Sequence, residues 1–256
     1  MNAPEQPRSK TRFDTIGKPR RRVDGRAKAI GELRFADDLA LPRMLHAKLL
    51  RSPHPHAAIE SLDVSRAQLH PGVHLVLTGA EFPVPYGIMP VSQDEYPLAR
   101  ERVRFVGDPV AAVIAIDEQT ATEALEKISV KYRPLATVAS PEEGLANPEP
   151  RIHDYGEQGN IHRNQAYEFG DVEEALARSE HVFEDLFFYE GNTHLPMEQQ
   201  ASLASVEGDG KLLLATSTQN PHYLHRQLAR VLQMPAARIR VIATPNGGAF
   251  GGKCDP

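Results

Sequence analysis

The organisation of this chain is clearest at Gly247-Gly248-Ala249-Phe250-Gly251-Gly252-Lys253-Cys254-Asp255-Pro256. Four glycines surround one aromatic ring, Phe250, and an apolar run at 239–243 comes shortly before them. Glycine tolerates positive φ and lets a backbone approach a ligand closely. Consecutive N–H groups in such a loop form a concave donor surface for an oxyanion or oxo group. Glycine clusters also form ordinary turns, with the aromatic ring buried, so both interpretations stay open.

A second polar stretch, Thr216-Ser217-Thr218-Gln219, ends an apolar run and precedes a helix predicted at 221–232. The order of strand, helix and strand places these side chains where α/β structures bind ligands, facing the glycine loop. Gln219 offers both a donor and an acceptor to a ligand. Helix capping by Ser217 or Thr218 is the alternative interpretation.

His194 and Glu198 lie four residues apart in a segment without helical periodicity. A histidine and a carboxylate at this spacing suit metal ligation or proton transfer. A glutamate at such a position more often pairs with a backbone N–H or with an arginine, and this interpretation is favoured. His222 and His225 share a helix face, but no third ligand accompanies them, so no protein-ligated metal site is predicted.

The hydrophobic periodicity, together with the positions of proline and glycine, predicts an α+β fold. The run 109–116 is continuously apolar, which is typical of a central strand. Residues 118–128 have the i, i+3, i+4 spacing of an amphipathic helix, and Asp171 is placed to cap another helix. Residues 81–96, rich in proline and tyrosine, predict a long functional loop. The remaining strands are expected at 32–35, 44–50, 58–63, 73–78, 102–105, 129–132, 181–189, 201–206, 212–216 and 238–242.

Four segments follow from this pattern. Residues 1–19 are polar and basic and are expected to be a flexible tail. Residues 20–135 form a first α/β domain. Residues 136–156 contain three prolines and Gly144 and are expected to be a linker. Residues 157–256 form the first part of a second, mixed α/β domain.

The charge is unevenly placed. The chain has 256 residues and a net charge of −5, yet residues 1–28 carry nine Lys/Arg against three Asp/Glu. A basic tail on an acidic body indicates a solvated arm or a partner contact. No basic stripe with stacking aromatics accompanies Arg20-Arg21-Arg22, so no nucleic acid is expected as a partner.

Cysteine usage and hydropathy limit the cellular compartments that suit this protein. A single cysteine, Cys254, permits no disulfide within the chain and leaves no ligand set for iron–sulfur clusters. No run approaches the length of a membrane-spanning helix, and the N-terminus lacks an apolar signal segment. The sequence therefore predicts a cytoplasmic protein.

Taken together, several motifs resemble the large, molybdenum-binding subunit of the xanthine oxidase and aldehyde oxidoreductase family. The motifs are Val23-Asp24-Gly25, Arg51-Ser52-Pro53-His54-Pro55-His56-Ala57, Gly107-Asp108-Pro109-Val110-Ala111, Met197-Glu198, Ser217-Thr218-Gln219 and Gly247 to Lys253. The resemblance covers about residues 23–254, the N-terminal portion of such a subunit. It implies a hammerhead domain followed by the first part of a molybdopterin-binding domain. Within the family, the loop 83–100 looks most like 4-hydroxybenzoyl-CoA reductase.

The resemblance also implies roles for residues. The cofactor-binding set is Gln219, Gly248, Ala249, Phe250 and Gly251, and the substrate pocket includes Phe250 and Glu198. Gln219 is implied to bind an oxygen ligand or the cofactor, and the Gly251 N–H to reach an oxo ligand. In the family the metal is held by the pterin, so no metal ligand is assigned. No catalytic residue is assigned either, because the family's catalytic glutamate lies beyond residue 256.

The implied cofactor is molybdopterin, in its cytosine dinucleotide form, with molybdenum. The implied partners are the remaining part of the large subunit, an iron–sulfur subunit and an FAD subunit. The implied activity is that of a molybdenum hydroxylase or related reductase acting on an aromatic or heterocyclic substrate, with the isolated chain inactive. The alternative is an accessory subunit that keeps the fold but binds no cofactor.

Overall fold

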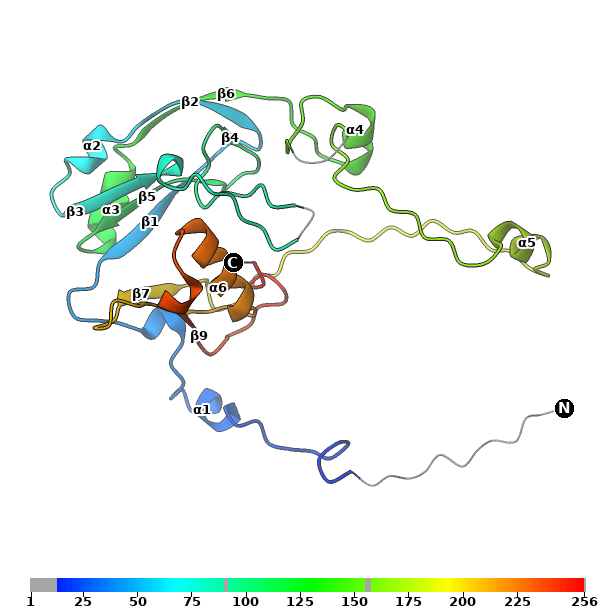
Figure 1. Ribbon diagram of the computed structural model, residues 1–256, viewed down its shortest axis with the longest axis horizontal. Helices are drawn as coiled ribbons and strands as arrows, with labels where there is room; N and C mark the ends of the chain where they lie inside the picture. The colour runs from blue at the N-terminus through cyan, green and yellow to red at the C-terminus, as the bar shows by residue number, and fades with distance from the viewer. Residues whose placement is uncertain (1–12, 90–91, 155–157, 256) are drawn as a thin grey trace.

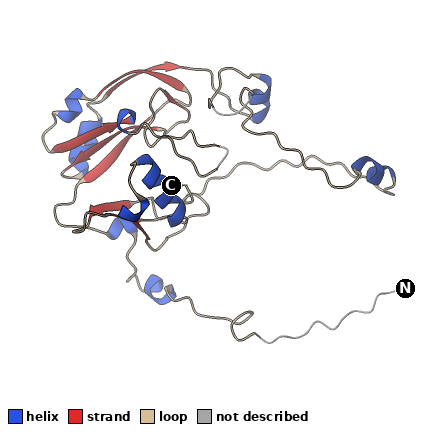
Figure 2. Cartoon of the chain, in the orientation of Figure 1, coloured by secondary structure: helices blue, strands red, loops and turns tan. Residues whose placement is uncertain are grey.

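The computed structural model describes residues 13–89, 92–154 and 158–255. Within these ranges it contains three separate three-stranded sheets, two built from residues 46–134 and one from residues 202–243 (Figures 1 and 2). The mixture of short helices and sheets agrees with the predicted α+β class. Residues 1–12 of the predicted tail, 1–19, lie outside the described residues.

The first sheet is antiparallel, in the order β1 (His46–Arg51), β5 (Pro109–Ala115), β3 (Val73–Thr78). The apolar run forms the central strand β5, which confirms the prediction for 109–116. Helix α3 (Glu118–Leu125) packs against this sheet together with α2 (Ser65–Gln68), and Asp117 caps α3 by accepting from the Thr120 N–H at 2.7 Å. Small side chains let the helices approach closely: the buried core here is Ala67, Val76, Val113, Ala115, Ala121 and Ala124.

The second sheet has the order β4 (Arg102–Val103), β2 (Ala57–Asp63), β6 (Ser129–Pro134), again antiparallel. The strands that flank α3 in sequence, β5 and β6, therefore belong to different sheets. The reason is that β5 already has a hydrogen-bonded neighbour on each edge, so β6 pairs with β2. A second core of Ala57, Ala99, Val103 and Val110 joins this sheet to β5.

The third sheet, in the second domain, has the order β7 (Ser202–Val206), β8 (Leu212–Thr216), β9 (Ile239–Ala243). β7 and β8 form the predicted hairpin, while β8 and β9 are parallel and are joined by α6 (Pro221–Val231) and the short helix η3 (Ala236–Arg238). This is the predicted β-α-β unit. It brings the ends of β8 and β9 to the same edge of the sheet, because parallel strands end on the same side.

The lead-in segment lies against the second domain, although it precedes the first in sequence. It contains α1 (Gly25–Ala29) and η1 (Ala36–Asp38), and η1 packs on β7. Lys28 Nζ donates to the Asn246 carbonyl at 3.4 Å, and the Phe35 ring lies beside Gly247. Residues near position 30 therefore help to hold the glycine loop near position 250.

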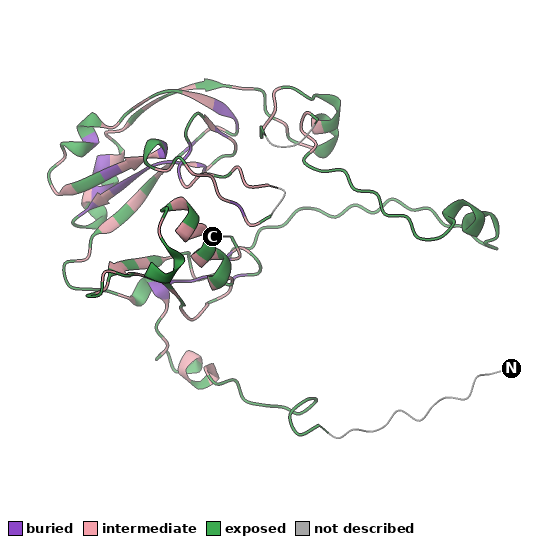
Figure 3. Cartoon of the chain, in the orientation of Figure 1, coloured by how far each residue is buried: buried purple, intermediate pink, exposed green. Residues whose placement is uncertain are grey.

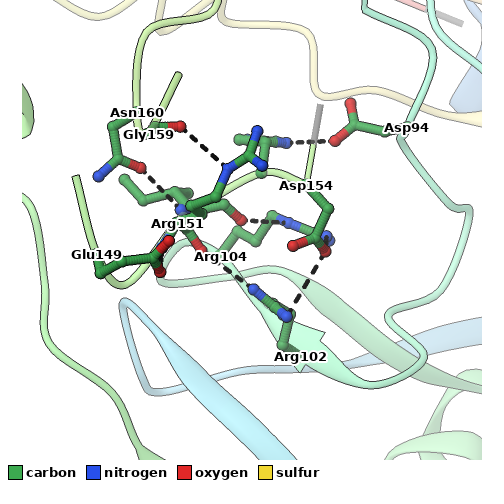
Figure 4. A network of polar contacts seen from close by, with 10 residues as sticks. Asp94, Arg102, Arg104, Glu149, Arg151, Asp154, Gly159 and Asn160 are labelled. Atoms are coloured by element: carbon green, nitrogen blue, oxygen red, sulfur yellow. Dashed lines mark hydrogen bonds and ion pairs between the residues drawn. The ribbon is translucent and has the colours of Figure 1, made fainter. Parts of the chain in front are cut away.

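The predicted linker is tied to the first domain by a polar network (Figure 4). It also contains a short helix, α4 (Pro141–Ala146). Arg104 Nε donates to the Ile152 carbonyl at 2.8 Å and Arg102 Nη1 to the Arg151 carbonyl at 3.1 Å. His153 Nδ1 lies 2.7 Å from an Asp94 carboxylate oxygen. Residues 151–153 are thus held against β4 and the long loop.

The long loop 83–100 follows the short helix η2 (Gly79–Glu81) in sequence. It contacts the second domain. Tyr86 and Glu95 pair across it, with the Tyr86 N–H donating to the Glu95 carbonyl at 2.8 Å. From α6, Gln227 Nε2 donates to the Gly87 carbonyl at 3.0 Å and Arg230 contacts Gln93. An apolar cavity of about 260 Å³ remains at this contact, lined by Tyr86, Pro97, Leu224, Gln227, Leu228 and Val231.

Two predicted strands are wrong for this chain. Residues 32–35 form no strand and lead directly into η1. Residues 181–189 are extended but pair with no strand among the described residues, and every one of them is exposed. They belong to a long excursion that also carries α5 (Val172–Ala177), whose cap at Asp171 is confirmed by a 2.8 Å hydrogen bond from the Glu174 N–H. Figure 1 shows the excursion leaving both domains, and Figure 3 shows it exposed along its length.

Candidate cofactor site at the glycine loop

The glycine loop follows β9 at the edge of the third sheet and turns sharply at residues 250–253. Three of its residues have positive φ: Gly248 (109°), Phe250 (53°) and Gly251 (92°). Glycine adopts such angles without strain, but phenylalanine does not. A non-glycine residue held there costs on the order of 1–3 kcal/mol, and such residues cluster at functional sites. The Phe250 side chain packs on little, since the residue is 75% exposed.

Glu198 forms hydrogen bonds to both ends of this loop. Its Oε2 atom lies 2.6 Å from Lys253 Nζ and accepts from the Gly247 N–H at 2.7 Å. The Lys253 side chain is 1% exposed and the Glu198 side chain 10%. This confirms the favoured pairing of Glu198 with a backbone N–H, whereas its basic partner is a lysine and not the expected arginine. The other carboxylate oxygen, Oε1, is buried without a hydrogen-bond partner among the described residues.

The glycines allow the segment 194–198 to lie directly beneath the loop. A Cβ atom at Gly247 would come within 2.8 Å of Glu198 Cβ, and one at Gly252 within 2.9 Å of His194 Cγ. Real Cβ atoms do not approach so closely, so both positions exclude larger residues. Gln200 Nε2 adds a 2.7 Å bond to the Gly252 carbonyl.

The end of β8 is bonded to the same loop, as the β-α-β order predicts. The Gln219 N–H donates to the Lys253 carbonyl at 2.8 Å, and the Cys254 thiol lies 3.4 Å from Gln219 Oε1. Asn246 Nδ2 donates to the Thr218 carbonyl at 3.1 Å. Gln219 is therefore joined to the loop through residues 253 and 254, and its side-chain Nε2 is left as a donor.

The alternative interpretation, helix capping by Ser217 or Thr218, is wrong for α6, because its N-cap residue is Asn220 and no side chain caps it. The Thr218 hydroxyl instead accepts from the Asn220 N–H at 3.1 Å, immediately before α6. This is a local turn bond between a side chain and the backbone, not a helix cap. Thr218 and Ser217 are buried, whereas Gln219 is exposed, so Gln219 is the side chain in this stretch that can meet a ligand.

The loop presents a row of donors. Among the described residues, no hydrogen-bond acceptor faces the backbone N–H groups of Gly248, Ala249, Phe250 and Gly251, whereas the next N–H groups, of Gly252 and Cys254, bond back into the turn. Ala249 is buried, so its contribution is its backbone and not its methyl group. An N–H group that has no protein acceptor donates to water or to a ligand. A row without a protein partner therefore suits oxygen atoms of a ligand.

A hollow of about 600 Å³ opens beside Gln219. It is lined by the first residues of α6, with the Arg226 guanidinium 4.8 Å from the Tyr223 ring centroid. Of the two helix histidines, His225 bonds to the Ala236 and Ile239 carbonyls. The described residues contain no group of three or more His, Cys, Asp or Glu side chains able to hold a metal ion.

Sequence reasoning missed the structural role of Lys253. Lys253 was visible as a lone charge after two glycines, and Glu198 as an acid with no local partner. Their meeting across 55 residues depends on the tertiary fold. His194 was singled out for its chemistry, but its packing against Gly251 and Gly252 could not be predicted from the sequence.

Comparison with known proteins identifies the family. Residues 30–136 match the model of the aldehyde oxidase and xanthine dehydrogenase a/b hammerhead domain, and residues 152–256 match the molybdopterin cofactor-binding domain. The chain belongs to this family and corresponds to the N-terminal portion of its molybdenum-binding subunit. The predicted order of the two domains is thereby confirmed.

Particular relatives agree with this. The chain is 40% identical to a probable xanthine dehydrogenase subunit from Bacillus subtilis, over 93% of this chain and 32% of the relative. It is 35% identical to the nicotinate dehydrogenase large molybdopterin subunit of Eubacterium barkeri, over 95% of this chain and 56% of the relative. Quinoline 2-oxidoreductase from Pseudomonas putida 86 superposes with a TM-score of 0.80 and 33% identity, covering 91% of this chain and 30% of that one. The chain thus spans about a third to just over half of these relatives.

One further finding concerns membranes. Across the residues that the structure describes, no helix is both long and apolar enough to cross a bilayer.

Proposed function

We propose that this chain supplies one wall of the molybdenum–pterin site of an oxidoreductase, a molybdenum hydroxylase or dehydrogenase. The observation that carries the proposal is the row of N–H groups at residues 248–251, which have no protein acceptor among the described residues. Glu198 bonds to the loop on both sides of this row, at the Gly247 N–H and at Lys253 Nζ. A donor surface without side chains suits the oxygen atoms of a bulky, anionic group.

The residues present fit such a group. A bound molybdenum–pterin cofactor supplies a centre that exchanges two electrons with a substrate carbon. Gln219 Nε2 and the Gly251 N–H would each donate to an oxygen atom of that group, and the backbone of Gly248 and Ala249 would border it. The exposed ring of Phe250 would lie against a planar substrate, since aromatic faces favour offset stacking. Glu198 would shape the substrate pocket from beneath the loop.

The exposed ring and three of the relatives support an aromatic substrate class. Xanthine, nicotinate and quinoline, which appear in the relatives' names, are all aromatic nitrogen heterocycles. An aromatic or heterocyclic substrate is therefore proposed. The loop 83–100 supports 4-hydroxybenzoyl-CoA as the narrower candidate, on its resemblance alone.

The complete enzyme would contain more than this chain. The remaining part of the molybdenum-binding subunit would supply the catalytic carboxylate and most pterin contacts, so the chain alone would not turn over. Iron–sulfur and FAD subunits would carry electrons, because the one cysteine of this chain cannot ligate a cluster. The cytosine dinucleotide form of molybdopterin, a cytoplasmic location and the boundaries 20–135, 136–156 and 157–256 belong to the same proposal.

The test is a metal and pterin analysis of the assembly purified through a tag on this chain. About one molybdenum atom and one pterin per copy are expected. Gly251→Ala should lower both, since it adds a methyl group beside His194 and strains a backbone at φ 92°. Gly208→Ala, in open space on the β7–β8 hairpin, is the matched control and should retain both. An assembly with neither metal nor pterin would favour the accessory subunit instead.

A further inference from the structure

Lys253 is bonded through both its side chain and its backbone, and the two sets of bonds lead to different parts of the candidate site. We propose that Lys253 is a positioning residue, which holds the N–H row of residues 248–251 and the Gln219 side chain in a fixed relation so that both can donate to one bound cofactor. The inference rests on the proposed function and deepens it by naming the residue that aligns the two sets of donors. Lys253 acts without touching the ligand, because its side chain is 1% exposed.

The side chain of Lys253 closes a ring of bonds around the N–H row. Its Nζ atom lies 2.6 Å from Glu198 Oε2, and the same oxygen accepts from the Gly247 N–H at 2.7 Å. Gly247 immediately precedes the row, and Lys253 follows it after Gly252. Fixing both ends of a segment before the ligand arrives reduces the conformational entropy that binding must remove.

The backbone of Lys253 holds Gln219. The Gln219 N–H donates to the Lys253 carbonyl at 2.8 Å, and the Thr218 hydroxyl donates to the same carbonyl at 3.5 Å. Asn220 Nδ2 adds a bond of 3.3 Å to the Cys254 carbonyl. Lys253 is therefore the residue that the row and Gln219 have in common, so a displacement of its backbone changes where Gln219 lies relative to the row.

Apolar packing cannot hold this loop in place. Four of its residues are glycines and Phe250 is 75% exposed, which leaves the methyl group of Ala249 as the buried apolar side chain between residues 247 and 252. Lys253, in contrast, is among the largest fully buried side chains of the described residues. Its long side chain reaches a carboxylate beneath the loop, and charge-assisted hydrogen bonds are about twice as strong as neutral ones. The ion pair therefore replaces the packing that anchors other loops.

The pair is poorly suited to raising overall stability. Two buried charges lose their hydration, and apolar residues of similar volume often stabilise a fold as well or better. Glu198 Oε1 adds to this cost, because it is buried with no partner among the described residues. Six buried side-chain atoms share that condition in the described part of the chain, and three of them, on Glu198, Thr244 and Asn246, lie at or beside this loop. Such a concentration indicates that the geometry of the site, and not stability, accounts for these polar groups.

The experiment replaces the whole pair, so that no charge is left alone. The double variant Glu198→Leu/Lys253→Met is introduced into the assembly purified through a tag on this chain. Glu118→Leu/Lys48→Met is the matched control, since that pair has the same 2.6 Å separation but lies exposed on the first domain. Molybdenum and pterin per copy should fall in the double variant, because loss of supporting contacts lowers the affinity of a metal centre about 10–100-fold. The control should keep both at the parent level.

Hydrogen exchange gives a readout that does not depend on bound metal. It is measured on parent and variant assemblies from cells grown without molybdate. The Gln219 N–H should exchange at least about tenfold faster in the double variant than in the parent, because its acceptor is no longer held in place. Amides of β8 and β9 should keep their protection, since the pair serves the site and not the fold.

Three results would overturn the proposal. They are a double variant that retains molybdenum at the parent level, an unchanged exchange rate at Gln219, and a loss of assembly or of protection in β8 and β9. The last result would show that the pair maintains the fold. A parent assembly without molybdenum would instead defeat the proposed function, and the Gln219 exchange rate would still decide the role of Lys253.

Discussion

Glu198 and Lys253 decide whether the glycine loop keeps its shape. Removing one partner of a buried ion pair leaves an uncompensated charge, which costs about 3–5 kcal/mol. Glu198→Leu and Lys253→Met are each expected to lower the free energy of unfolding by an amount of that order. The double variant should lose less than the sum, because neither charge is then left unpaired. Urea unfolding of the four proteins measures the coupling, and strict additivity would contradict a direct ion pair.

Phe250 is the residue at which backbone strain and exposure coincide. A left-handed conformation costs an L-residue about 1–2 kcal/mol, and glycine's extra unfolded-state freedom offsets about 0.5–1 kcal/mol of the relief. Phe250→Gly is therefore expected to leave stability unchanged or to raise it by up to about 1 kcal/mol. In the assembly the same change should raise KM for an aromatic substrate. A marked loss of stability would show that the ring packs more than its 75% exposure implies.

At the scale of elements, the loop that joins β4 to β5 carries a buried carboxylate, that of Asp108. Burial raises the pKa of Asp108 above its ordinary value, although the Arg104 N–H, which donates to Asp108 Oδ2 at 2.9 Å, acts in the opposite direction. A carboxyl whose pKa is raised in the folded state destabilises the fold as pH rises from its unfolded value of 3.8 through the folded value.

Asp108→Asn removes this ionisation and keeps an acceptor for the Arg104 N–H. The variant is expected to unfold at a higher temperature than the parent at pH 7. Below pH 3.8 the two should converge, since the aspartic acid is then neutral in both states. Each unit of pKa shift corresponds to about 1.4 kcal/mol. Thermal melts at both pH values measure the difference, and a variant less stable at pH 7 would contradict a costly buried charge.

Elements with a strong local signal were predictable. The apolar run 109–116 became the central strand β5, the hairpin β7–β8 formed where turn residues separate two apolar runs, and Asp171 caps α5. The segment 181–189 had the composition of a strand but formed none, because a strand needs a second edge to bond. That edge is not among the described residues.

At the scale of the whole molecule, the exposed excursion at residues 163–193, here called the arm, should govern how the isolated chain behaves. Exposed aromatic segments promote self-association. Replacing Phe183 and Phe187 by serine is expected to raise the soluble fraction of the chain expressed alone several-fold. Leu69→Ser, at a singly exposed residue that is 84% exposed, should change little. Centrifugation and light scattering measure the effect, and an unchanged soluble fraction would indicate that the arm is not the source of association.

The sequence by itself determined the fold class through local signals, namely the hydrophobic period, capping side chains and turn residues. Its motifs indicated the family and the order of the two domains by their resemblance to known proteins, and they predicted the candidate site at residues 219 and 247–253. The tertiary structure alone decided that Glu198 meets Lys253, that the lead-in near residue 30 supports the loop near residue 250, and that residues 181–189 are left unpaired. Such contacts join segments far apart in the chain, and they depend on which surfaces the fold brings within bonding distance.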